Sequence, residues 1–293
     1  MKQDCYAYKY KRPMLHKFII FLFVICSFES MILAQEAKKD TVPATTLEKK
    51  LEKKPYGVSQ FVHETFLFVK QPAKWDGNDW LKIGAVVVVT IGLMPLDQKI
   101  NKATQGDQHY YYSVPIVGGR VYGEWYSIGG VTAVFAAYGI LTQNNTSKRV
   151  AVEVLQAGLY SELVTTVLKV AIGRARPLIT DNSYSYRPFT FFDDNYHSMP
   201  SGHTTSAVAL STVMSRHADK LIFKILAYVP AAFTMFSRIY QDKHWLSDEI
   251  PAAAIGYFTG NWVVNLHEGK KHRINVASVY PPVIIFSLNR ESK

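Results

Sequence analysis

The sequence predicts an all-α protein: a bundle of about six core helices, embedded in or associated with a membrane, with an N-terminal export signal. Apolar blocks recur from about Lys82 onward, rich in Ala and Leu and separated by Gly, Asn, Asp or charged clusters. A hydrophobic share of 48% in 293 residues is enough for a sizeable core. The predicted helices cover residues 83–96, 127–142, 150–173, 204–214, 221–236 and 250–264.

Residues 1–34 are typical of an export signal. Basic residues precede the apolar run FIIFLFVIC, and Ala34 offers a small residue at a cleavage point. Both cysteines, Cys5 and Cys26, lie in this segment, so a cleaved chain has no thiols, which excludes disulfides and thiolate metal sites. An uncleaved anchor helix is the alternative.

The remaining chain divides by composition into three parts. Residues 35–79 are polar and rich in lysine, which predicts a linker with an amphipathic segment. Residues 80–270 hold the apolar blocks and form the predicted helical domain. Residues 271–293 form a C-terminal tail, in which the stretch 274–289 is β-like and contains a Pro pair.

Some features of the sequence disfavour a membrane location and others favour it. Most apolar runs are about 11–16 residues long, shorter than the ~20 that a bilayer core requires, and the mean hydropathy of −0.01 is low for a polytopic protein. Basic residues on alternate connections favour a membrane, as do the aromatic loops 109–126 and 183–196 on the opposite side. Membrane association is therefore favoured over an exported bundle that does not cross. The basic residues are Lys148, Arg149, Arg216, Lys220, Lys270, Lys271 and Arg273.

The topology has one difficulty. If residues 18–34 cross the membrane and all six later helices cross too, the aromatic loops lie on the wrong face. Either residues 61–70 or the helix at 83–96 then does not span, or the domain is the exported bundle.

The net charge of +10 has several explanations, among them anionic lipid. The sequence has no zinc-finger spacing and no basic helical stripe with base-reading residues. We therefore expect no nucleic-acid partner. Protein partners are not indicated.

Three short clusters of polar residues lie at predicted helix ends in the second half of the chain. The first is Lys169 followed, after six residues, by Arg176 and Pro177. Positions seven apart share a face of a helix, so both cations are expected to point the same way, and Pro177 is expected to end the helix. Taken alone, such a pair usually complements the helix dipole.

The second cluster is the tetrapeptide Pro200-Ser201-Gly202-His203, at the start of a predicted helix. Ser201 can cap the helix, and Gly202 lets a ligand approach the backbone. Free N–H groups and the helix dipole make such an N-terminus an anion site, with the imidazole of His203 beside the anion. A plain serine cap with an incidental histidine is the simpler interpretation of this cluster in isolation.

The third cluster comprises Ser237, Arg238, His244 and Asp248. His244 and Asp248 are expected one helical turn apart, so that the carboxylate accepts a hydrogen bond from one imidazole nitrogen and leaves the other free as a nucleophile. The helices at 204–214 and 221–236 form a hairpin, hinged at residues 216–220, that returns Arg238 to the side of His203. Together the clusters supply three cations, two histidines and a carboxylate, a set suited to phosphate and without a carboxylate cage for a metal ion.

In this combination the three motifs resemble one superfamily, which comprises type 2 phosphatidic acid phosphatases, bacterial class A acid phosphatases and vanadium haloperoxidases. No motif position is substituted, and the resemblance covers roughly residues 80–265. It implies that His244 attacks phosphorus, Asp248 orients His244, and His203 is the general acid and base. Phosphate would be bound by Lys169, Arg176, Ser201, Gly202 and Arg238, with no metal and no cofactor.

The resemblance implies a metal-independent phosphatase for lipid phosphomonoesters or pyrophosphates, acting through a phosphohistidine. Its expected location is the bacterial cell envelope, in the cytoplasmic membrane with a periplasm-facing site. A soluble periplasmic acid phosphatase and a vanadium haloperoxidase are alternatives within the superfamily, and a non-catalytic membrane-binding protein is an alternative outside it. The aromatic loop 183–196 is either a lid or acyl-chain guide over the site, or a plain interfacial loop.

Overall fold

The computed structural model describes residues 56–106 and 108–269, and the fold in these ranges is all-α, as predicted. The described residues also contain one isolated bridge, between Arg174 and Tyr186, and short 3₁₀ turns. These turns are η2 (Gln71–Lys74), η3 (Pro177–Ile179), η4 (Asp194–Tyr196) and η5 (Leu246–Asp248). The predicted export signal, residues 35–55 of the predicted linker and the C-terminal tail lie outside the described residues. The helices are α2 (Val58–Val69), α3 (Gly77–Gln105), α4 (Val114–Tyr122), α5 (Trp125–Leu141), α6 (Asn145–Ile172), α7 (Gly202–His217), α8 (Leu221–Leu226), α9 (Val229–Tyr240) and α10 (Glu249–His267).

Helix ends are set by local side chains and by one glycine. The Asp76 side chain accepts hydrogen bonds from the backbone N–H groups of Asn78 and Asp79, which caps α3. Asn144 caps α6 in the same way. At its other end α6 stops at Gly173, whose φ of 62° is left-handed and therefore suits glycine. The chain thus leaves α6 earlier than Pro177, where the sequence predicted the end.

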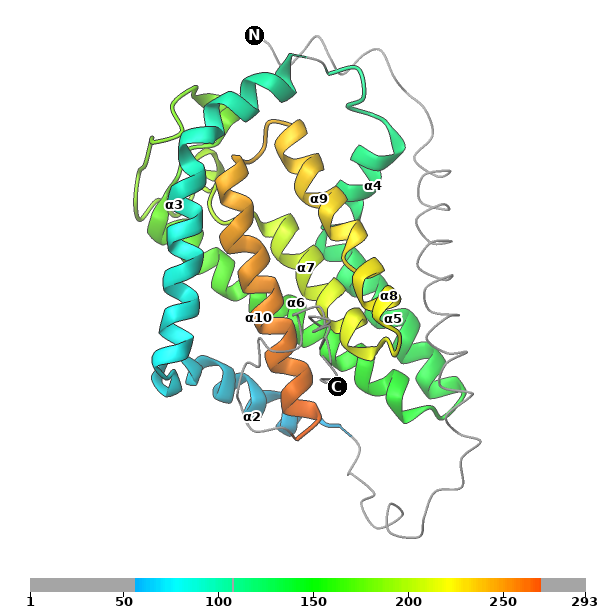
Figure 1. Ribbon diagram of the computed structural model, residues 1–293. Coiled ribbons are helices and arrows are strands. Elements are labelled where there is room, and N and C mark those ends of the chain that lie inside the picture. The colour runs from blue at the N-terminus through cyan, green and yellow to red at the C-terminus, as the bar shows by residue number, and fades with distance from the viewer. Residues whose placement is uncertain (1–55, 107, 270–293) are drawn as a thin grey trace, which may run out of the picture.

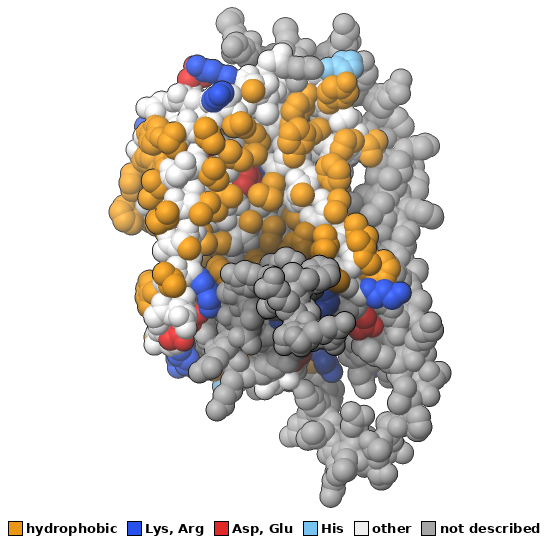
Figure 2. Space-filling model, in the orientation of Figure 1, with side chains coloured by type: hydrophobic (Ala, Val, Ile, Leu, Met, Phe, Trp, Pro, Cys, Tyr) orange, Lys and Arg blue, Asp and Glu red, His pale blue; other side chains and the backbone are white. Residues whose placement is uncertain are grey.

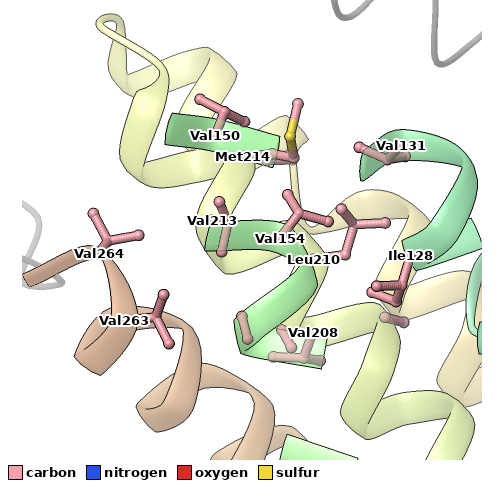
Figure 3. Close-up of a cluster of buried hydrophobic side chains, with 14 of the residues drawn as sticks. Ile128, Val131, Val150, Val154, Val208, Leu210, Val213, Met214, Val263 and Val264 are labelled. Atoms are coloured by element: carbon pink, nitrogen blue, oxygen red, sulfur yellow. The ribbon is translucent and has the colours of Figure 1, made fainter. Parts of the chain in front are cut away.

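The core is built around α7, in which every residue from 204 to 215 is buried. α10 packs closely on α7 because Gly256 and Gly260 lack side chains: a Cβ at Gly256 would lie 2.5 Å from the carbonyl oxygen of Thr205. Figure 3 shows apolar side chains of α5, α6, α7 and α10 meeting in this core. They include Ile128, Val131, Val150, Val154, Val208, Leu210, Val213, Val263 and Val264.

The chain runs up and down the bundle several times (Figure 1): α8 and α9 lead to its upper end, whereas α7 and α10 lead away from it. The upper end in that view holds the C-termini of α6 and α9 and the N-termini of α7 and α10. The lower end holds α2, which is joined to α10 by a 3.3 Å contact between Glu64 and His267.

Three helical stretches are long and apolar enough to cross a membrane: Gly77–Gln105, Asn145–Ile172 and Leu221–Tyr240. They exceed the apolar runs predicted from the sequence because polar residues at both ends continue the helices. Figure 2 shows hydrophobic side chains spread broadly over one face of the molecule. The exposed apolar residues include Val87, Val88, Val89, Ile91, Ile222, Ile225, Phe233 and Phe236. α2 has 12 residues, fewer than the ~20 that a bilayer core requires.

The structure corrects the predicted elements in two places: the predicted aromatic loop 109–126 contains α4, and the predicted helix 221–236 is divided into α8 and α9. α2 lies within residues 35–79, where the sequence predicted an amphipathic segment. α4 has a weak local signal because it contains a proline and two consecutive glycines. Its contacts with α9 stabilise it, among them hydrogen bonds from Thr234 to the carbonyl oxygen of Gly119 and from Ser237 to that of Ile116, each 2.7 Å.

Candidate active site

The three sequence clusters meet at the upper end of the bundle in Figure 1. The Nη1 atom of Arg176 lies 3.4 Å from Nε2 of His244, which joins the first cluster to the third. The predicted hairpin is present, since α7 leads away from this end and α8 and α9 return to it. The residues that the structure brings to this end are Lys169, Arg176, Ser201, Gly202, His203, Arg238, His244 and Asp248.

His244 is buried, with 2% of its surface exposed, and its two ring nitrogens have different surroundings. Nδ1 lies 2.7 Å from the carbonyl oxygen of Ser198. A carbonyl oxygen only accepts, so Nδ1 carries the hydrogen and Nε2 is unprotonated, with its lone pair toward Nη1 of Arg176. Burial, followed by the charges of Arg176 and Lys169, holds the pKa of His244 well below its usual value. At neutral pH the ring is uncharged.

The expected hydrogen bond between His244 and Asp248 is not formed, because residues 241–245 are not helical and the two residues do not share a helix face. Asp248 Oδ2 lies 3.8 Å from His244 Nδ1. It accepts hydrogen bonds instead from Ser198 Oγ at 2.5 Å and from the Trp245 N–H at 2.8 Å. Asp248 therefore acts on the imidazole indirectly, by fixing the residue whose carbonyl oxygen holds Nδ1.

Asp248 is held in turn by Arg174, which the sequence prediction missed. Arg174 is fully buried and donates to Asp248 Oδ1 at 2.6 Å and to Asp97 Oδ2 at 2.7 Å. Asp97 lies on α3, and its other oxygen accepts from the Ser247 N–H at 2.9 Å. The sequence GRARP contains Arg174 two positions before Arg176. No local pattern indicated that the partner of Arg174, Asp97, lies on α3.

Three cations surround the imidazole from different elements. Lys169 lies in the last turn of α6, and its Nζ donates to the carbonyl oxygen of His197 at 2.7 Å. Arg176 lies beyond the end of α6, so the predicted shared helix face with Lys169 is wrong. Arg176 is held by Asp194, which accepts from its Nε and Nη2 at 2.8 Å each. Arg238 on α9 is 5% exposed, and its Nε has no hydrogen-bond partner among the described residues.

The N-terminus of α7 supplies backbone donors beside these cations. Ser201 is the N-cap residue, but its side chain makes no capping hydrogen bond, contrary to the prediction. A Cβ at Gly202 would meet the Glu162 carboxylate at 3.5 Å and Cε of Lys169 at 3.7 Å, which are ordinary contacts. Packing therefore does not require a glycine at position 202. Access of a ligand to the backbone N–H groups remains as a reason for a glycine at this position.

His203 faces a carboxylate that the sequence prediction also missed. Its Nε2 lies 3.1 Å from Oε1 of Glu124, the N-cap residue of α5. Burial lowers the pKa of His203 and the hydrogen bond with Glu124 raises it; burial prevails, so the pKa is below its usual value. Glu124 lies within the segment predicted as an aromatic loop, where no pattern connected it to the site.

A further carboxyl group, Glu249, lies beneath the site. It is fully buried, accepts a short hydrogen bond from Thr204, and burial raises its pKa to about 8. It is therefore largely protonated at neutral pH and adds no full negative charge beside the cations. In the described part of the chain no group of three or more His, Cys, Asp or Glu side chains is arranged to hold a metal ion.

Comparison with known proteins agrees with the resemblance seen in the motifs. Residues 150–271 match the PAP2 superfamily. A lipid A 1-phosphatase of Porphyromonas gingivalis is 35% identical over 75 residues, and a lipid A 4'-phosphatase of the same species is 31% identical over 67 residues. These matches cover 24% and 23% of this chain and only 17% and 28% of the two relatives.

A solved structure shares the fold. The transmembrane PAP2 type phosphatidylglycerolphosphate phosphatase from Bacillus subtilis superposes with a TM-score of 0.51 at 20% identity. The superposition covers 65% of this chain and 96% of that one. The two proteins thus share an overall helical fold.

Proposed function

Because residues 150–271 form a region of the PAP2 superfamily, we propose that this protein is a metal-independent phosphatase that hydrolyses lipid phosphomonoesters or pyrophosphates through a phosphohistidine. One observation carries the proposal. The imidazole of His244 has one nitrogen fixed by a carbonyl oxygen and the other 3.4 Å from the guanidinium of Arg176. A neutral nucleophile next to a cation is the arrangement required for attack on a bound phosphate.

In the first step Nε2 of His244 attacks phosphorus and the bond from phosphorus to the leaving oxygen breaks. His203 donates its proton to that oxygen, so the leaving group departs as a neutral alcohol or a protonated phosphate. Lys169, Arg176 and Arg238 bind the non-bridging oxygens, together with the Ser201 hydroxyl and the Gly202 N–H. Fixed cations of this kind stabilise the transition state by position and charge.

In the second step a water molecule attacks the phosphohistidine. His203, now neutral, accepts a proton from the water, the P–N bond breaks, and inorganic phosphate is released. Asp248 contributes by holding Ser198, whose carbonyl oxygen accepts the Nδ1–H of His244 and stabilises the positive charge that forms on the ring. The cycle restores both histidines to their starting protonation states.

Membrane lipids are the proposed substrates, and the first to test is lipid A phosphate, since the two relatives are lipid A phosphatases. The proposed location is the cytoplasmic membrane with the site on the periplasmic face. The basic residues Lys148, Arg149, Arg216 and Lys220 support this orientation. They lie at the start of α6, in the last turn of α7 and in the connection to α8, at the end of the bundle opposite the site, where the positive-inside rule expects the cytoplasm.

The phosphohistidine is tested with the purified full-length protein, a ³²P-labelled phosphate ester and a rapid quench. The wild-type protein should carry label that is stable in alkali and lost in acid. His244→Asn should lose both label and turnover, because asparagine fills part of the buried space and can donate to the Ser198 carbonyl oxygen but has no nucleophilic nitrogen. Turnover near the wild-type rate in this variant would remove His244 as the nucleophile.

Metal independence is tested separately. Activity should survive EDTA, because the three cations occupy the place that a metal ion takes in other phosphatases. Loss of activity on chelation, restored by Mg²⁺, would contradict the proposal. A halide-oxidation assay with vanadate checks the haloperoxidase alternative.

A further inference from the structure

Three phenylalanines are exposed on the segment that joins the first two motifs. The segment from Arg187 to Tyr196, called the Phe loop below, exposes Phe189 at 72%, Phe191 at 64% and Phe192 at 102%. Scattered exposed apolar residues are common on proteins, but three aromatic rings within four positions form a patch, and such patches mark interaction surfaces.

The exposure is not the result of a poorly anchored loop. The Arg187 N–H donates to the Gly173 carbonyl oxygen at 2.6 Å, and the Phe189 N–H donates to the Val170 carbonyl oxygen at 2.8 Å. Phe189 has a φ of 59°, a left-handed conformation that is unfavourable for a bulky residue. The backbone is thus held in an unfavourable conformation while the ring stays outside the core.

The Phe loop is connected directly to the phosphate-binding cations. Asp194, within the loop, accepts two hydrogen bonds from Arg176. His197, directly after the loop, accepts from Lys169 through its carbonyl oxygen and has its ring Nε2 2.7 Å from the Thr190 carbonyl oxygen. The position of the loop and the position of the cations are therefore coupled.

The Phe loop lies at the membrane-facing side of the bundle. Tyr186, immediately before it, contacts Met94 on α3 through its hydroxyl at 4.0 Å from Sδ. α3 is a candidate membrane span that exposes Val88 and Ile91. Figure 1 shows the loop beside the upper half of α3, and Figure 2 shows hydrophobic side chains on that edge of the molecule. The exposed rings are thus continuous with the apolar surface of a spanning helix.

We infer that the Phe loop binds the lipid surface, with Phe189, Phe191 and Phe192 among the acyl chains, and so presents the phosphate of a membrane lipid to Arg176 and Lys169. Apolar rings favour the acyl region, whereas the loop's charged members Arg187, Asp193 and Asp194 favour the headgroup level. The inference rests on the proposed function and specifies its substrate class: a phosphate carried by a lipid with long acyl chains.

The test compares two substrates in the full-length protein reconstituted in vesicles: phosphatidic acid in the bilayer and p-nitrophenyl phosphate in solution. The double variant Phe191→Ser/Phe192→Ser should lose about tenfold or more in kcat/KM on phosphatidic acid, because two rings no longer partition into the acyl chains. On p-nitrophenyl phosphate it should stay within about twofold of the wild type, since neither ring contacts the cations.

Two control variants make the comparison specific. Phe66→Ser, which removes a ring of 61% exposure from α2 at the other end of the bundle, should leave both rates unchanged. Phe191→Leu/Phe192→Leu should retain the rate on phosphatidic acid, because leucine also partitions into lipid. Equal losses on both substrates, or a loss on neither, would overturn the inference. If the wild type hydrolyses neither these two substrates nor lipid A phosphate, the proposed function itself has failed.

Discussion

Arg174 donates a 2.6 Å hydrogen bond to Asp248, with both side chains fully buried. Through its other terminal nitrogen Arg174 binds Asp97 on α3, outside the region that matches the PAP2 superfamily. This pair connects an outer helix to the carboxylate that holds Ser198, and Ser198 holds the imidazole of His244. The imidazole of His244, the proposed nucleophile, is therefore oriented by a chain of buried contacts that begins outside the three motifs.

Removing Arg174 should destabilise the protein strongly. Arg174→Ala leaves Asp97 and Asp248 buried without their cation, which typically costs about 3–5 kcal/mol. Thermal unfolding in detergent should show a markedly lower midpoint. Lys82→Ala, which removes a cation of a part-exposed pair with Asp79, is the control and should change stability by less than about 1 kcal/mol. Equal stability of the two variants would contradict a structural role for Arg174.

The activity should depend on the protonation of His203, and Glu124 should set its pH range. Because the pKa of His203 is below its ordinary value of 6.5, kcat/KM should fall as the pH rises through that lowered pKa and the general acid loses its proton. Glu124→Gln removes the charge that raises this pKa, so the falling limb should move to lower pH. The measurement is kcat/KM on a soluble monoester from about pH 4 to about pH 8.

A role of Glu124 in folding alone would predict a different result for the same variant. It would lower kcat/KM by the same factor at every pH and leave the shape of the profile unchanged. A limb that does not move therefore excludes Glu124 as the residue that positions and tunes His203.

Two glycines near the site should respond differently to alanine. Gly173→Ala forces a side chain onto a residue with a φ of 62° and places Cβ 1.8 Å from the Arg187 carbonyl oxygen, so the protein should lose stability. Gly202→Ala meets only ordinary contacts and should fold normally. It should nevertheless weaken inhibition by vanadate, because the methyl group hinders approach of an anion to the backbone N–H. Unchanged inhibition in a folded Gly202→Ala protein would argue against that contact.

α2 should be attached in a pH-dependent way at the end opposite the site. Glu64 on α2 is 5% exposed and contacts His267, whose Nδ1 lies 3.3 Å from Glu153. Burial lowers the pKa of His267, but the hydrogen bonds and charges of Glu153 and Glu64 outweigh it and hold the pKa above 6.5. The stabilisation is thus complete below pH 6.5 and is lost as the pH rises through the raised pKa.

Glu64→Gln tests this attachment. The variant should unfold at a lower temperature than the wild type below pH 6.5, and the difference should shrink at higher pH as His267 loses its charge. Activity on a soluble monoester should be unchanged, because Glu64 lies at the far end of the bundle. A difference that grows with pH would contradict the assigned contact.

The helical class and the composition of the site could be predicted because both depend on local pattern. Apolar blocks gave the six main helices, and the fixed spacing within each motif identified Lys169, Arg176, His203, Arg238 and His244. The hairpin prediction also held, since two helices joined by a short polar turn run antiparallel. These features depend on periodicity and turn chemistry within a few dozen residues.

Partners distant in sequence could not be predicted in the same way. The expected bond between His244 and Asp248 assumed a helix that the chain does not form there, and Ser198 takes that place. Asp97 and Glu124 have no local signature, because their partners lie 77 and 79 positions away on other elements. α4 is likewise stabilised by contacts with α9 that could not be predicted from the sequence of α4 alone.

By itself, then, the sequence determined which side chains make up the candidate site and which segments become helices, because spacing and apolar periodicity are properties of the chain. Only the tertiary structure decided how the imidazole of His244 is oriented, which carboxylates hold Arg174 and His203, and where the phenylalanines of the Phe loop face. The physical reason is that hydrogen bonds and ion pairs act over a few ångströms. Residues that are far apart along the chain come within this distance of each other only when the chain folds.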